Sequence, residues 1–299
     1  MNQQHPIIEQ YQTHLTEAGK SEHTVRAYGH DLASFIRWWE QTTGDRFQPK
    51  VVVHRDILDY RGFLQQRGRT PATINRRLNG LRKFFQWTRR QQLTPDSPFD
   101  LIETIFVKQQ NDTAPAWLDP NQQLALIRAI RKKESKRDLA IIRTFLGAGL
   151  RISELAGLTV EDVKISDRKG SLTVTGKGMK QRTIPLNKQT RAALTAYLEE
   201  RPDHPSQRLF IGQRGPLTER GINQLVTKYA YQARLEQCTA HTLRHSFAKN
   251  LVDTGTPLDQ VAVLLGHETL ETTKIYTRPS QQDLERAVRR AAGEVEEGI

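Results

Sequence analysis

The chain has 299 residues, 36% of them hydrophobic and 26% charged, which excludes a disordered protein and provides for two domains with cores of their own. Its net charge of +12 at pH 7 favours a polyanionic partner, because each lysine or arginine placed on a phosphate releases condensed counterions. A merely solvated basic surface is the alternative on charge alone.

The only cysteine, Cys238, excludes an intrachain disulfide and a thiolate-rich zinc site, and we interpret it as a buried structural thiol. The first residues lack the charged and apolar regions of a signal peptide. Apolar runs such as Leu139–Leu150 are short and interrupted by Arg143, so no membrane span is expected. These features indicate a cytoplasmic protein.

The N-terminal part of the chain shows helical periodicity without a strand pattern, which predicts a small helical bundle. Ser21 is a good N-cap and Pro71 suits the first turn of a helix. The predicted helices cover Ile7 to Thr16, Ser21 to Trp39, His54 to Gln66, and Pro71 through Arg90.

The last of these helices carries an apolar stripe backed by a basic face. Such a helix can pack on its neighbours and lie along DNA, with a solvated amphipathic helix as the alternative. The DNA-binding candidates on it are Arg76, Arg77, Arg82 and Lys83.

Prolines at Pro95 and Pro98 end the bundle, and the polar stretch Lys108–Pro115 breaks all periodicity. We therefore expect an N-terminal DNA-clamp domain of residues 1–107, a linker of residues 108–116 and a C-terminal catalytic domain of residues 117–299. A flexible tether between two basic domains would let them close around a duplex.

Beyond Pro120, helical periodicity resumes and short strands interrupt it, which predicts a mostly helical domain with one small antiparallel sheet. Gly147 and Gly149 are expected to end a helix just before Arg151. The predicted strands are Val163–Ile165, Ser171–Thr175 and Arg182–Pro185, the last two forming a hairpin. The predicted helices are Leu124–Ile130, Leu139–Leu146, Ser153–Leu158, Lys188–Glu200, Thr218–Arg234, Thr242–Asp253, Leu258–Leu265 and a tail helix at Gln281–Ala292.

Arginine and histidine side chains are placed where they could hold a phosphate. Arg151 precedes a short predicted helix whose first N–H groups favour anions, and Glu154 could orient a neighbouring basic side chain. His241 and Arg244 share one helix face, a spacing that lets both touch one phosphate. A surface arginine and a chance pairing are the alternatives. His245 is expected to point elsewhere and to be structural.

A phenol could supply the nucleophile for phosphoryl transfer, provided that nearby cations stabilise its phenolate. Tyr276 is the candidate, although tyrosines are usually half-buried packing residues. His267 follows Gly266 and would project from a turn, where structural histidines are also common. Lys177 lies at the predicted hairpin tip, where it could enter a DNA groove or simply be solvated.

In order along the chain, this set resembles the active site of the tyrosine recombinases, most closely the bacterial Xer type. The resemblance covers nearly the whole chain, and the combination of motifs is far more specific than any one of them. It is carried by Arg151, Lys177, His241-x-x-Arg244, Leu265-Gly266-His267 and Tyr276. Further similarity lies in Ser21-x-x-Thr24-x-x-x-Tyr28-x-x-Asp31-Leu32 and Gly176-Lys177-Gly178-x-Lys180-x-Arg182-x-x-Pro185-Leu186.

The resemblance implies a SAM-like core-binding domain and a catalytic domain in which Tyr276 attacks DNA to form a 3′-phosphotyrosine link. Arg151 and Arg244 would hold the nonbridging oxygens, and Lys177 would protonate the leaving 5′-oxygen. His241 would act in proton transfer, and His267 would bind the phosphate. Supporting and DNA-binding roles are implied for Glu154, Lys180 and Arg182.

The resemblance also implies that neither a metal ion nor ATP nor another cofactor is needed. The expected partner is double-stranded DNA with a specific core site, bound by a dimer at each site and a homotetramer on two duplexes. Strand exchange would pass through a Holliday junction, with an accessory protein or a second recombinase as further partners. Two alternative functions are a DNA-binding accessory protein and a type IB topoisomerase. The intact catalytic set disfavours the first, and the compact Xer-like architecture with its tail helix disfavours the second.

Overall fold

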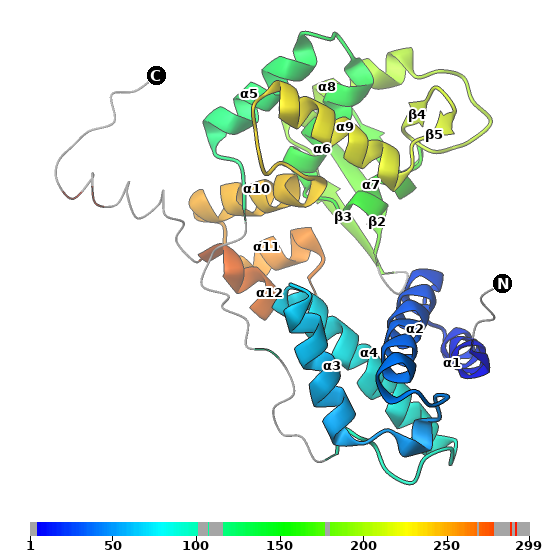
Figure 1. Ribbon diagram of the computed structural model, residues 1–299. Helices are drawn as coiled ribbons and strands as arrows, with labels where there is room; N and C mark the ends of the chain where they lie inside the picture. The colour runs from blue at the N-terminus through cyan, green and yellow to red at the C-terminus, as the bar shows by residue number, and fades with distance from the viewer. Residues whose placement is uncertain are drawn as a thin grey trace. The chain divides into compact units, whose positions relative to one another are not determined.

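The structure of the chain, a computed structural model, describes residues 5–100, 107, 116–176, 180–267, 269–277, 288 and 291. It comprises two compact units, Met1–Asn111 and Asp112–Ile299 (Figure 1). Nearly all of the predicted linker and of the predicted tail helix lies outside the described residues, as does Lys177. No helix within the described ranges is long and apolar enough to cross a membrane.

The first unit is a helical bundle, as its periodicity predicts. Its elements are α1 (Pro6–Glu17), α2 (Glu22–Thr43), the 3-10 turn η1 (Pro49–Val51), α3 (His54–Gln66) and α4 (Pro71–Arg90). Ser21 caps α2, because its hydroxyl accepts the backbone N–H of Thr24 at 3.3 Å. The core is rich in aromatic rings: Phe35 contacts Tyr60 and Phe85 edge to face at centroid distances of 5.1 and 6.4 Å.

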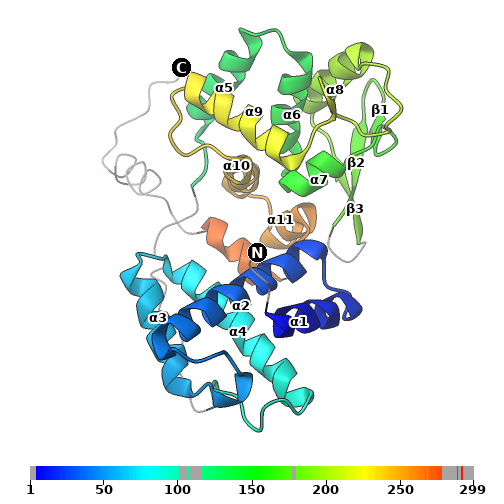
Figure 2. The same cartoon turned by 45° about the vertical axis from the view of Figure 1, so that its right-hand side comes forward.

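The second unit combines helices with a three-stranded sheet, which lies at one side of the unit (Figure 2), and a two-stranded sheet. Its helices are α5 (Pro120–Arg131), α6 (Lys136–Ala148), α7 (Ile152–Gly157), α8 (Lys188–Glu200), α9 (Glu219–Gln232), α10 (Ala240–Asp253), α11 (Leu258–Leu265) and α12 (Glu271–Lys274), followed by the 3-10 turn η3 (Ile275–Thr277). Its strands are β1 (Val163–Ile165), β2 (Gly170–Thr175), β3 (Gln181–Pro185), β4 (Ile211–Gly212) and β5 (Gly215–Pro216). The predicted fold class is confirmed.

The three-stranded sheet is antiparallel in the order β1-β2-β3. Leu172 of β2 pairs with Ile184 of β3, and both side chains are buried against the core. The ladder runs to the pair Thr175–Gln181, and the Gly176 N–H then donates to the Lys180 carbonyl at 2.8 Å. The bounds of the three predicted strands are confirmed to within one residue. The sheet also brings the base of the hairpin beside the candidate site.

The two glycines expected to end α6 have different roles. Gly147 lies inside the helix, where a side chain would collide with Thr190, so glycine here permits close packing of α6 on α8. The prediction that it stops the helix is wrong. Gly149 is the cap, with φ +60°, and a side chain there would also collide with Phe247. Because α6 ends at Gly149, Arg151 lies at the start of α7.

Candidate active site

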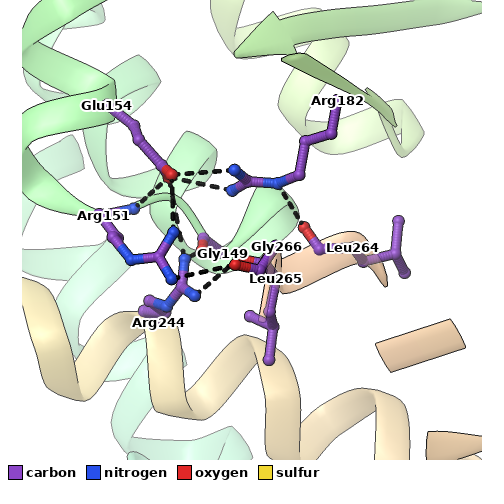
Figure 3. Close-up of polar contacts among 8 residues, drawn as sticks. All are labelled: Gly149, Arg151, Glu154, Arg182, Arg244, Leu264, Leu265 and Gly266. Carbon is purple, nitrogen blue, oxygen red and sulfur yellow. Dashed lines mark hydrogen bonds and ion pairs between the residues drawn. The ribbon is translucent and has the colours of Figure 1, made fainter. Parts of the chain in front are cut away.

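A buried carboxylate, Glu154, gathers three arginines in the second unit (Figure 3). It accepts hydrogen bonds from Nη1 of Arg151 at 2.9 Å and from two nitrogens of Arg182 at 2.9 and 3.0 Å. Nη1 of Arg244 lies 3.8 Å from it. Three guanidinium groups and one carboxylate leave a net charge of +2, which suits a phosphate diester with two nonbridging oxygens.

Local backbone geometry places Glu154 and Arg151. Arg151 is the N-cap of α7, and its backbone N–H donates to the side chain of Glu154 at 2.7 Å. Glu154 is the third residue of the helix, the position whose side chain accepts this bond in a capping box. Burial alone would raise the pKa of Glu154, but hydrogen bonds from Arg182 and Arg151 outweigh it and hold the pKa below its usual value. The carboxylate therefore stays ionised, and Arg151 keeps an exposed face at the helix N-terminus.

Arg244 is a buried arginine, with 3% of its surface exposed. Its Nη1 donates to the carbonyl of Gly149 and its Nη2 to the carbonyl of Leu265, each at 2.7 Å. Burial and the nearby Arg151 lower the pKa of Arg244 to about 10, so the side chain remains charged at neutral pH. The two predicted arginines therefore lie together: Arg151 is exposed, and Arg244 is buried and held by two main-chain carbonyls.

The predicted histidines flank this cluster. Gly266 has φ +65°, and after it Nδ1 of His267 lies 2.9 Å from the hydroxyl of Thr273. Burial and the charges of Arg244 and Arg151 lower the pKa of His267 to about 4, so its ring is neutral. His241 lies on the first turn of α10 and remains accessible to solvent; partial desolvation of its ring, together with the charges of Arg244 and Arg151, lowers its pKa.

Tyr276, in η3, is 1% exposed. Its hydroxyl lies 2.8 Å from Nδ1 of His245, and its ring stacks on His267 at a centroid distance of 6.5 Å. Burial raises the pKa of Tyr276, while Arg244 and Arg151 lower it in part. The expectation that His245 points elsewhere is wrong, because α10 turns its side chain toward η3, where Tyr276 lies.

A groove of about 800 Å³ lies beside the arginines. Its charged and polar lining includes Arg151, Glu154, Lys180, Gln181, Arg182, His267 and Thr272. Arg182 also donates from Nε to the carbonyl of Leu264 at 2.9 Å, which ties β3 to the turn that carries His267. No cluster of metal-binding side chains occurs among the described residues.

The basic candidates on α4 make contacts within the first unit. Nη2 of Arg76 donates to the buried Asp31 at 2.8 Å, and Nε of Arg77 lies 3.8 Å from the same carboxylate. Nζ of Lys83 donates to the hydroxyl of Tyr28 at 2.9 Å. Since half of the Arg76 side chain is exposed, this ion pair orients the guanidinium without hiding it.

The fourth candidate, Arg82, lies over the ring of Phe99 at 5.5 Å, a cation–π contact that holds it along the helix. Lys180 is exposed at the rim of the groove. The resemblance implies a DNA-binding role for Arg182. In the structure its guanidinium forms an ion pair with Glu154, and 13% of the side chain is exposed.

Comparison with known proteins matches both units. The phage integrase family matches residues 116–283, and the phage integrase N-terminal SAM-like domain matches residues 8–92. Tyrosine recombinase XerC of Myxococcus xanthus is 34% identical over 94% of this chain and 95% of its own length. Tyrosine recombinase XerD of Listeria monocytogenes is 32% identical over 88% and 90%, respectively.

Among solved structures, the XerH site-specific recombinase bound to a palindromic difH substrate, in a post-cleavage complex, shares the fold. Its TM-score is 0.77 at 23% identity, over 90% of this chain and 80% of that chain.

Proposed function

Because the chain belongs to the phage integrase family and is an Xer-like tyrosine recombinase, we propose that it cleaves and rejoins DNA at a specific site through Tyr276. The observation that carries this proposal is the convergence of Arg151, Arg244, His267 and Tyr276 in one unit. These residues come from four separate parts of the chain, and packing alone gives no reason to concentrate so much positive charge beside a phenol.

In the proposed reaction the phenolic oxygen of Tyr276 attacks the scissile phosphorus, and the bond to the 5′-oxygen breaks. The products are a 3′-phosphotyrosine link and a free 5′-hydroxyl, whose proton comes from Lys177. Arg151 and Arg244 stabilise charge that develops on the nonbridging oxygens. Neutral His267 donates a hydrogen bond to the phosphate through Nε2, since Nδ1 faces Thr273. In the proton transfer with Tyr276, His241 accepts the proton that the phenol loses.

The covalent link conserves the energy of the phosphodiester bond, so rejoining by the reverse attack requires neither ATP nor a metal ion. Exchange of strands between two duplexes then proceeds in two steps through a Holliday junction. Two protomers act at each core site and four on the pair of duplexes, with residues 281–292 docking on a neighbouring protomer. An accessory protein or a second recombinase is a further proposed partner.

We also propose the domain roles. Residues 1–107 form a core-binding domain, residues 108–116 a linker and residues 117–299 the catalytic domain. Separate hydrophobic cores in the two units support this division. The exposed part of Arg76 and the net charge of +12 support duplex DNA as the partner, and the related XerH was solved on its difH substrate.

Covalent trapping tests the proposal. Wild-type protein is incubated with nicked duplexes carrying candidate sites from around its own gene, and adducts that resist SDS are resolved on a gel. We expect an adduct with the wild type and none with Tyr276→Phe, which should still bind the duplex. Tyr231→Phe is the matched control, because that tyrosine is 85% exposed in the same unit. An adduct with Tyr276→Phe would refute the assignment of the nucleophile.

A further inference from the structure

The hydroxyl of Tyr276 does not face the groove that holds the charged residues. Tyr276 is 1% exposed and is absent from the groove lining, whereas Arg151 and His267 line it. Its side chain packs in a small apolar cluster with Phe247, Val261 and other buried residues. A phosphate seated in the groove is therefore out of reach of the phenol in this conformation.

Among the residues that the structure describes, the hydroxyl has one polar partner in this position, since Nδ1 of His245 lies 2.8 Å away. His245 is itself 8% exposed, and its ring contacts His241 at a centroid distance of 4.1 Å. A buried phenol without a partner would carry the desolvation penalty of an unsatisfied donor. The histidine removes that penalty, so it makes the buried position of the tyrosine a stable one.

Burial is the main reason that the pair stays neutral. Arg244 on α10 and Arg151 at the start of α7 face the phenol, and His241 and His267 face the imidazole. Burial, with His241 and Arg244, lowers the pKa of His245 to about 4, and burial raises the pKa of Tyr276. The proton therefore stays on the phenol, and in the tautomer that leaves Nδ1 unprotonated the imidazole accepts a hydrogen bond from it rather than removing the proton.

We propose that His245 is a positioning residue that holds Tyr276 in a protected, protonated state before cleavage. The hydrogen bond between them must break before the phenol reaches the scissile phosphate. This inference rests on the proposed function, because it takes Tyr276 as the nucleophile. It assigns to the second histidine of His241-x-x-Arg244-His245 a task separate from binding the phosphate.

Two polar variants separate this task from a merely structural one. Asparagine places an amide oxygen near the position of Nδ1, so His245→Asn keeps an acceptor for the phenol. Glutamine places its amide near Nε2, so His245→Gln retains polarity but moves the acceptor away. Wild type and both variants are labelled with 3-fluorotyrosine, and the resonance of Tyr276 is assigned by its loss in Tyr276→Phe.

The first readout is the 19F solvent isotope shift between H2O and D2O, measured without DNA. We expect a shift close to zero for the wild type and His245→Asn, and a clear shift for His245→Gln. The second readout is the initial rate of adduct formation on the nicked duplex. His245→Gln should form the adduct about fivefold faster than His245→Asn, the factor that one hydrogen bond of ordinary net strength supplies.

A buried Tyr276 resonance in His245→Gln would overturn the proposal, as would a slower adduct rate in His245→Gln than in His245→Asn. Should the wild type form no adduct, the proposed function fails, and the isotope shift still decides whether His245 holds the phenol. The two failures are therefore distinguishable.

Discussion

Replacement of Glu154 by glutamine tests whether one carboxylate holds the arginine cluster together. Glutamine keeps the shape and one acceptor oxygen, but it removes the negative charge that Arg151, Arg182 and Arg244 share. Breaking a buried ion pair by removing one partner costs about 3 kcal/mol or more, because the charges of Arg182 and Arg244 stay largely buried and uncompensated. For a unit of this size, that corresponds to a decrease in Tm of roughly 6–12 °C.

The pH dependence has a definite sign. The folded pKa of Glu154 is depressed, so its contribution to stability is present above the unfolded pKa and is lost as pH falls through the folded pKa. The gap in unfolding free energy between wild type and Glu154→Gln should be full at neutral pH. It should begin to shrink as pH falls below the ordinary glutamate value of 4.5 and keep shrinking at lower pH.

Urea unfolding at a series of pH values measures this gap. Glu161→Gln is the control, because Glu161 is an exposed glutamate in the same unit and its replacement should change stability by less than about 0.5 kcal/mol. Equal stability of Glu154→Gln and wild type at neutral pH would refute the role of the carboxylate. A gap that is independent of pH would show that packing, not charge, is responsible.

Three further changes probe other parts of the molecule. Arg151→Ala should slow single-turnover cleavage by about 3 kcal/mol of transition-state stabilisation, and an unchanged rate would remove Arg151 from the site. Gly149→Ala should lower the free energy of urea unfolding by about 1–3 kcal/mol, since φ is +60° and Phe247 is in the way; wild-type stability would contradict this strain. Arg76→Ala should reduce the slope of log affinity against log salt by about 0.9 in filter binding, and an unaltered slope would place Arg76 off the DNA backbone.

The elements that repeat a pattern could be predicted from sequence, and the contacts between them could not. Helix α3 and helix α8 match their predicted bounds because their apolar residues recur over several turns. Helix α12 and turn η3 were not predicted, since seven residues are too few to show a period. The strand pair β4–β5 was missed for the same reason, having two residues in each strand.

Within the candidate site, the residue types and their order could be predicted from the sequence, but the hydrogen-bond and ion-pair partners of each residue could not. Glu154 was expected to orient one basic side chain, and it binds Arg151 and Arg182 directly. Adjacent residues on a helix diverge by about 100°, so the sequence predicts that the side chain of His245 points away from Arg244. Only the position of η3 shows that this side chain reaches Tyr276. A contact between side chains from distant segments produces no periodic pattern in the sequence, so it cannot be predicted from one.

Arg244 joins two main-chain carbonyls that lie 95 and 21 residues away along the chain. Such long-range links form only when the intervening chain has closed, so they depend on the rest of the unit being folded. A nascent or partly unfolded copy therefore lacks both the assembled charge and the buried tyrosine. We expect such a copy to be unable to carry out the DNA cleavage proposed above, so that the proposed activity depends on the completed fold.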